Sequence, residues 1–143
     1  MKRILCLTLF ICSLASSCFA SAHLPYFPRW YPVSANDQIR MFIDQDTGRW
    51  EIDKEGLWGH KGHAIATVWV MFHYIADDEY FLHYGLWCLD CKTYEQLRTA
   101  SYNSDGKFEG ASWYESINKI TIPNGTKGEF ILNALKRIWE TKK

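Results

Sequence analysis

The residues from Thr67 to Cys91, TVWVMFHYIADDEYFLHYGLWCLDC, decide the fold of this chain. Both ends of the stretch are rich in β-branched and aromatic residues, which favour extended strands. Asp77, Asp78 and Glu79 separate the two ends and are typical of a turn. The pattern predicts a central β-hairpin whose first strand, Thr67 to Ile75, is apolar on both faces.

The register of this hairpin decides which side chains share a face. A turn centred near Asp78 places His73 opposite His83 and Trp69 opposite Trp87, at about the 5 Å separation of cross-strand pairs. These four side chains are therefore the candidate binding face. Because a slip of one residue would undo the pairing, the register is a prediction that a structure can test.

The segments before the hairpin either alternate between apolar and polar residues or show no regular pattern of apolar residues. Gln38 to Asp44 alternates apolar and polar side chains, which predicts a half-buried strand, and Arg49 to Ile52 predicts a second, short one. Asp53 to Ala64 (DKEGLWGHKGHA) has three glycines and no period, so we expect a solvated loop. His23 to Pro32 holds three prolines and predicts an extended lead-in.

After the hairpin, Tyr94 to Tyr102 fits a helix or a strand, but the turn at Asn103 to Gly106 favours a hairpin into Lys107 to Ser112. A further extended segment, 113–122, ends at a proline. Thr126 and Glu129 form a capping box, and four apolar residues follow on one helical stripe: Ile131, Ala134, Leu135 and Ile138. The predicted fold is α+β, with about six mostly antiparallel strands and one C-terminal amphipathic helix packed on a face.

The first 22 residues have the pattern of a secretory signal peptide. Met1 to Arg3 is basic, Ile4 to Leu14 is apolar, and Ala20 to Ala22 is a small-residue cleavage site. We therefore expect residues 23–143 to form a single exported domain in the periplasm, on the outer-membrane surface or outside the cell. The residues before Cys18 loosely resemble a lipoprotein signal, which would make the protein lipid-anchored. No segment has the roughly 20 apolar residues of a transmembrane helix.

Charge excludes one class of partner. Removing Lys2 and Arg3 with the signal leaves 14 basic against 16 acidic residues. A mixed, slightly acidic surface predicts no nucleic-acid binding. The chain also has 7 Trp, 8 Tyr and 8 Phe, and such rings can fill a core or line a binding face.

Cys88 and Cys91 are the cysteines that remain after the signal, and in an oxidising compartment we expect them to pair. Trp87-Cys88-Leu89-Asp90-Cys91 also has the layout of a thiol–disulfide exchange site. Such a site needs a helix N-terminus at the first thiol, whereas here strands flank the motif and the charge of Asp90 disfavours a thiolate. The sequence therefore favours a structural disulfide, with a periplasmic thiol–disulfide protein as the alternative.

The histidines give two weaker candidate sites. His60 and His63 in the loop could bind zinc or haem, although their spacing is unspecific. His73 and His83 could do the same if the predicted register holds, but hydrogen-bonded side chains on an aromatic face are the simpler interpretation. The sequence has no recognisable nucleophile with its base and no glycine-rich phosphate loop. It predicts a protein that is not an enzyme and has no cofactor, with a haem- or metal-binding protein as a further alternative.

The order of these features resembles the bacterial surface-adhesin protein E family, over roughly Trp30 to Trp139. The matching pieces run from the strand that ends in an aspartate to the start of the last helix: Met41 to Asp44, Thr67 to Val70, Asp90-Cys91, Leu97 to Tyr102, Asp105-Gly106 and Ile122 to Thr126. The resemblance implies a small antiparallel sheet with the helix on its face. It also implies a non-enzymatic protein of the cell envelope that binds a host extracellular or envelope protein, as an adhesin does.

The chain departs from the family pattern at its cysteines. In that pattern the residue at the position of Cys91 is typically matched by a cysteine at the end of the last helix, but here that end reads Ile138-Trp139-Glu140. The resemblance therefore implies that a local Cys88–Cys91 bond replaces a long-range tie. We expect apolar contacts, including those of Trp139, to hold the helix.

Overall fold

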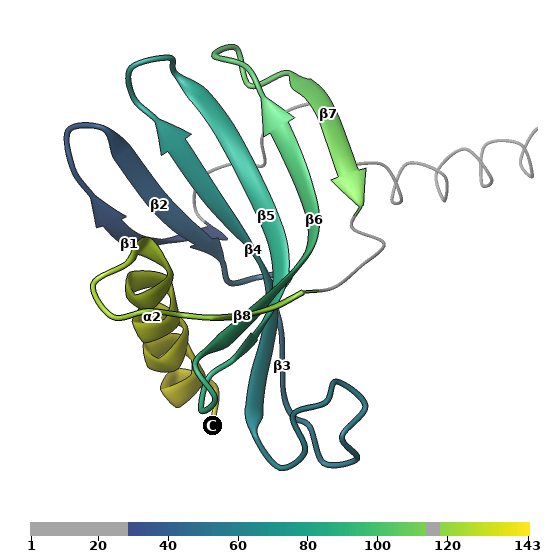
Figure 1. Ribbon diagram of the computed structural model, residues 1–143. Coiled ribbons are helices and arrows are strands. Elements are labelled where there is room, and N and C mark those ends of the chain that lie inside the picture. Colours follow the sequence, from purple (N-terminus) through teal and green to yellow (C-terminus); the bar gives the residue numbers. More distant parts are fainter. Residues whose placement is uncertain (1–28, 114–117) are drawn as a thin grey trace, which may run out of the picture.

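The computed structural model describes residues 29–113 and 118–143, so the predicted signal peptide and the possible lipidation at Cys18 lie outside the described residues. Within these residues, eight strands form one antiparallel sheet, and a helix follows them (Figure 1). The strands are β1 (Trp30–Ala35), β2 (Ile39–Asp44), β3 (Arg49–Ile52), β4 (Ala64–Tyr74), β5 (Glu79–Cys88), β6 (Thr93–Tyr102), β7 (Phe108–Trp113) and β8 (Lys119–Thr121). The helix is α2 (Lys127–Lys142). The predicted α+β class is confirmed, with eight strands in place of about six.

The strands follow the order β1-β2-β4-β5-β6-β7, while β3 also pairs with β4 and β8 also pairs with β6. β1 lies at the end of this order and begins within the segment 23–32, which was predicted only as an extended lead-in. Its Pro32 has no N–H to donate, and such a residue is tolerated in an edge strand or at a bulge. The register shifts between Pro32 and Ser34, so β1 meets both conditions.

The predicted hairpin forms as β4 and β5, but its predicted register is wrong. The structure pairs His73 with Tyr80, Val70 with His83, Trp69 with Tyr84 and Ala66 with Trp87. The last paired residues at the turn are Tyr74 and Glu79, and Asp78 adopts a positive φ of 51° within the turn. The turn therefore begins earlier than the acidic residues alone suggest. A slip of three residues is odd, so it moves His73 and His83 to opposite faces of the sheet.

α2 begins and packs as its sequence predicts. The hydroxyl of Thr126 accepts a hydrogen bond from the Glu129 N–H, and the Glu129 carboxylate accepts one from the Gly125 N–H. The first bond satisfies an N–H group that the first turn of a helix leaves free, and the second ties the residue before the N-cap to the helix. The four residues of the predicted stripe are buried, Leu132 is buried with them, and Trp139 packs partly buried against the same core.

The helix covers one face of the sheet beside β1 and β2 (Figure 1). Beneath it lies the main apolar core, which takes side chains from α2 and from the facing side of β2, β4 and β5, including Ile43, Val68, Val70 and Trp87. The opposite face carries two smaller clusters, one around Met71 and Leu82 and one around Ile65, Leu86 and Cys88. Within residues 29–113 and 118–143, no helix is long and apolar enough to cross a membrane.

Candidate functional site

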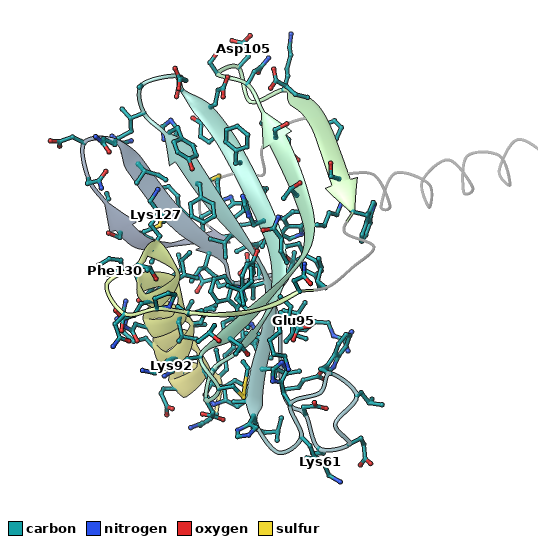
Figure 2. All side chains as sticks on the ribbon, in the orientation of Figure 1. Lys61, Lys92, Glu95, Asp105, Lys127 and Phe130 are labelled. Carbon is teal, nitrogen blue, oxygen red and sulfur yellow. A yellow bond between two sulfur atoms is a disulfide. The ribbon has the colours of Figure 1, made fainter. Side chains whose placement is uncertain are left out.

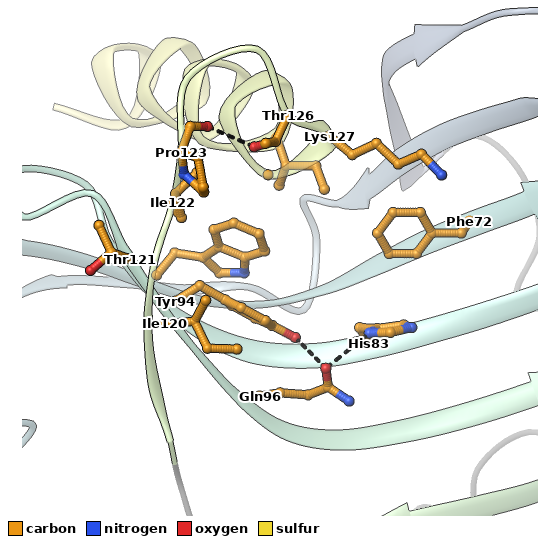
Figure 3. A pocket seen from close by; sticks show the side chains of 13 residues that line it. Phe72, His83, Tyr94, Gln96, Ile120, Thr121, Ile122, Pro123, Thr126 and Lys127 are labelled. Carbon is orange, nitrogen blue, oxygen red and sulfur yellow. Dashed lines mark hydrogen bonds between the residues drawn. The ribbon is translucent and has the colours of Figure 1, made fainter.

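A pocket of about 280 Å³ lies between the start of α2 and the sheet, and we call it the helix pocket (Figure 3). Its walls are mostly apolar. They come from β4, β5 and β6, from β8 and the connection after it, and from the first turns of α2. The lining residues are Phe72, His83, Trp87, Tyr94, Gln96, Ile120, Thr121, Ile122, Pro123, Thr126, Lys127, Gly128 and Ile131.

One side of the helix pocket carries a short chain of polar groups. The Gln96 side-chain oxygen accepts a hydrogen bond from the Tyr94 hydroxyl at 3.1 Å, and it lies 3.3 Å from His83 Nδ1 (Figure 3). Burial lowers the pKa of His83 below its ordinary value, and the bond to Gln96 offsets part of this effect. His83 is therefore neutral near pH 7, with Nδ1–H donating to Gln96 and Nε2 left as an acceptor.

Trp87, in the wall of the helix pocket, carries a buried donor. Its ring is 4% exposed and packs on the ring of Tyr94 with centroids 4.3 Å apart. Its Nε1–H is buried and has no hydrogen-bond partner among the described residues. A buried polar group without a partner costs free energy, and an orphan of this kind needs an explanation. An acceptor on a bound molecule is one, once the side chains that cover the nitrogen move to admit it.

The four residues of the predicted binding face do not share a face. His83 and Trp87 line the helix pocket, whereas Trp69 and His73 lie on the other side of the sheet. The ring of His73 stacks on that of Tyr80, and its Nε2 lies 2.7 Å from a carboxylate oxygen of Asp78. Burial and then the charge of Asp78 raise the pKa of the Tyr80 hydroxyl. His73 is thus a partnered histidine of the hairpin and lies outside the helix pocket.

Trp69 belongs to an aromatic patch on the outer part of the sheet. Its ring lies 5.1 Å from that of Tyr84, and the Arg98 guanidinium is 5.8 Å from Trp69 and 4.4 Å from the ring of Trp113. Contacts of this kind between a cation and the faces of rings are attractive. The patch therefore uses its own arginine to cover the two tryptophans.

The predicted disulfide is present between Cys88 and Cys91, with Cα atoms 5.3 Å apart. Figure 2 shows it as a yellow bond at the end of the sheet where Lys92 lies. Cys88 ends strand β5 and is fully buried, and turn residues and strand β6 follow it. Neither a helix N-terminus nor an exposed first sulfur is found here, which are the features that activate a thiol in exchange enzymes.

His60 departs from the predicted solvated loop. Its side chain is 2% exposed, with Nε2 3.0 Å from a Glu95 carboxylate oxygen and Nδ1 3.5 Å from the sulfur of Cys91. The loop is ordered because the buried carboxylate of Asp53 accepts hydrogen bonds from the N–H groups of Trp58 and His60. His63 is half exposed and faces Asp90, so the two histidines have different partners.

Sequence reasoning missed much of the helix pocket. Tyr94 and Gln96 alternate with other polar residues in a segment whose pattern fits a helix as well as a strand. The β8 residues come from a segment that was expected only to be extended. The one sequence signal for Tyr94 and Gln96 is their position, shortly after the cysteine pair. Comparison with protein-family models, with curated proteins and with solved structures finds no match.

Proposed function

We propose that this chain is an exported, non-enzymatic binding protein that holds an apolar side chain of a protein partner in the helix pocket. The observation that carries the proposal is the Trp87 Nε1–H, a buried donor without a partner in the wall of an apolar pocket. The partner is a host extracellular or envelope protein, in keeping with the resemblance to the adhesin family.

The chemistry of the pocket supports binding in preference to catalysis. Binding pockets are typically apolar with a few well-placed polar groups. Here those groups are the Trp87 donor and the Gln96 amide, whose oxygen is already engaged by Tyr94 and His83. A partner that inserts an apolar group, displaces the side chains over the Trp87 nitrogen and directs one acceptor at it, such as a backbone carbonyl, would satisfy the orphan donor and release its cost.

The rim of the helix pocket supports a macromolecular partner. Ile120 is 49% exposed and Pro123 is also exposed, and both line the pocket. The apolar surface thus continues from the pocket to the solvent, so a partner larger than the pocket gains contact area outside it. Interfaces commonly concentrate their binding energy on one side chain seated in a pocket with weaker contacts around it.

The test is solid-phase binding of the protein to a panel of immobilised extracellular-matrix, serum and envelope proteins. Ile120→Glu places a charge at the mouth of the pocket, and Leu57→Glu places the same charge at an 82% exposed position outside it. We expect Ile120→Glu to weaken binding at least tenfold and Leu57→Glu to leave it unchanged. Uniformly absent binding would contradict the proposal, and equal losses in both variants would place the site elsewhere.

A further inference from the structure

A second cluster of reactive side chains lies outside the helix pocket, where the 53–63 loop meets the end of β5. We propose that reduction of the Cys88–Cys91 disulfide converts His60, Cys88 and Cys91 into a binding site for one zinc ion. This site uses no residue of the helix pocket, so the inference is independent of the proposed function.

The three donor atoms are already close together. His60 Nδ1 and the two sulfurs lie within 4.8 Å of one another, and Nδ1 is 3.5 Å from the sulfur of Cys91. Zinc takes sulfur at about 2.3 Å and imidazole nitrogen at about 2.0–2.1 Å in tetrahedral geometry, which sets the distance between two such ligands at about 3.5 Å. The nitrogen therefore already stands at a ligand distance from the Cys91 sulfur, and the Cys88 sulfur has to move away from Cys91 to take its own position.

Glu95 points the correct nitrogen at the sulfurs. A carboxylate accepts hydrogen bonds, so its contact with Nε2 at 3.0 Å places the proton there and leaves the Nδ1 lone pair directed at Cys91. Metal-binding histidines almost always have such a partner on the other nitrogen. Lys119 forms an ion pair with the same carboxylate at 3.8 Å, which helps to hold Glu95 in place beside the ring.

Backbone groups prepare the rest of the site. The Asp53 carboxylate accepts the N–H of His60 at 2.9 Å and so fixes the loop residue that carries the imidazole. The N–H of Cys91 lies 3.2 Å from the sulfur of Cys88, and a donor at this place favours a thiolate. Both ligand segments are therefore held in place before a metal binds, which lowers the entropic cost of ordering them on binding.

The donor set selects the class of metal. Two thiolates and one imidazole suit zinc and other soft ions in preference to calcium or magnesium. Within the part of the chain that the structure describes, His60, Cys88 and Cys91 are the one group of three such donors, which leaves the fourth zinc position to water or to an external ligand.

The chemistry couples the site to the redox state. A dithiol reductant gives two electrons and two protons to the disulfide, which becomes two thiols while the reductant becomes a disulfide. Zinc then displaces the two thiol protons and binds both sulfurs and Nδ1 of His60. Since the disulfide has no thiolate to offer, zinc binding and the Cys88–Cys91 bond exclude each other.

The test uses the full chain with Cys6, Cys12 and Cys18 replaced by serine, so that Cys88 and Cys91 are the only cysteines. Zinc affinity is measured by competition with a chromophoric chelator, for the reduced and the oxidised protein. Cobalt serves as a second probe, because thiolate binding gives a charge-transfer band in the near ultraviolet. We expect the reduced protein to bind one zinc at least 100-fold more tightly than the oxidised protein.

Variants identify the ligands. We expect His60→Ala to weaken zinc binding by the reduced protein at least tenfold, and Glu95→Gln to weaken it about tenfold because it removes the orienting carboxylate. His63→Ala, which alters a half-exposed histidine of the same loop, is the matched control and should bind as the parent does. Far-ultraviolet circular dichroism checks that each variant is folded.

Three results would overturn the inference. They are equal affinity of the reduced and oxidised chains, a His60→Ala variant that binds as tightly as its parent, and a His63→Ala variant that loses as much affinity as His60→Ala. The first comparison involves no substitution at the site, so it decides the matter even if His60→Ala fails to fold.

Discussion

The ring of Tyr94 occupies the space that a side chain on Gly85 would need. A Cβ atom on Gly85 would lie 2.3 Å from Cε2 of Tyr94 and 2.8 Å from the carbonyl oxygen of Glu95. The same ring packs on Trp87 and lines the helix pocket. Gly85 thus allows the two aromatic rings to form one wall of the pocket.

Gly85→Ala should therefore destabilise the protein and disturb the helix pocket. The Tyr94 ring can move but the Glu95 backbone cannot do so cheaply, so we expect a loss of about 1–3 kcal/mol in the free energy of unfolding. Urea unfolding measures it. Gly110→Ala is the matched control, since a Cβ there meets nothing within 4 Å, and it should change stability by no more than about 0.5 kcal/mol. Equal stability of the two variants would mean that Tyr94 is free to move.

Much of this fold follows from local pattern. The alternation of apolar and polar residues predicted β2, and β-branched and aromatic residues predicted β4 and β5. The capping box at Thr126 predicted the first turn of α2. The register of the hairpin did not follow, because three acidic residues fit several turn positions. The backbone of Asp78 resolves the choice by taking a positive φ, and the Ile75 N–H bonds the Gln38 carbonyl outside the hairpin.

Trp87→Phe tests whether the orphan N–H has a role in binding. The substitution keeps an aromatic ring and removes a buried donor that has no partner, so the lost packing and the relieved desolvation cost largely offset each other. We expect stability within about 1 kcal/mol of wild type, against a loss of about 3–5 kcal/mol for Trp87→Ala.

Binding should respond differently from stability. Trp87→Phe should weaken the solid-phase binding of any partner that the wild type retains, and the indole N–H resonance of Trp87 should shift downfield when that partner is added to the wild type. A partner that binds both proteins equally and leaves this resonance unmoved would show that the helix pocket stays empty in the complex.

The two candidate sites depend on contacts between distant parts of the chain, which sequence pattern does not report. His60 lies 35 residues from Glu95 and 31 from Cys91, yet it contacts both. The glycines around it suggested a solvated loop, and the buried Asp53 that orders the loop looks like any surface acid in the sequence. The cysteine pair was predictable because its residues are three apart and no other cysteine follows the signal.

His83 should make stability fall in mild acid. Burial lowers its folded pKa below the unfolded value of about 6.5, so above that pH both states are neutral and the contribution is constant. As the pH falls below about 6.5, the unfolded chain takes up a proton that the folded chain resists. The free energy of unfolding therefore decreases as the pH falls from about 6.5 to the folded pKa of His83. The decrease is no more than about 1.4 kcal/mol per pH unit.

The His83→Asn variant isolates this effect, since asparagine does not titrate and can still donate to Gln96. Urea unfolding between pH 7.5 and about 5 should show a smaller loss for His83→Asn than for wild type. His63→Ala, which alters a half-exposed histidine, is the control and should keep most of the wild-type loss. Parallel curves for wild type and His83→Asn would show that His83 is protonated equally in both states.

Reduction of the Cys88–Cys91 disulfide should cost less stability than the loss of a long-range disulfide would. The bond closes a loop of only four residues, and the loop-entropy relation then gives about 2 kcal/mol, against about 3 kcal/mol for a 15-residue loop. The helix should stay in place, because Ile131, Leu135 and Ile138 are buried without any covalent tie to the sheet. Urea unfolding in a metal chelator, with and without a dithiol reductant, measures the difference. The stability of the Cys88→Ala/Cys91→Ala variant should not change when the reductant is added. A loss of 5 kcal/mol or more on reduction of the wild type would exceed the about 4.7 kcal/mol given for a 100-residue loop. Such a loss would show that the disulfide stabilises more of the structure than the turn that it closes.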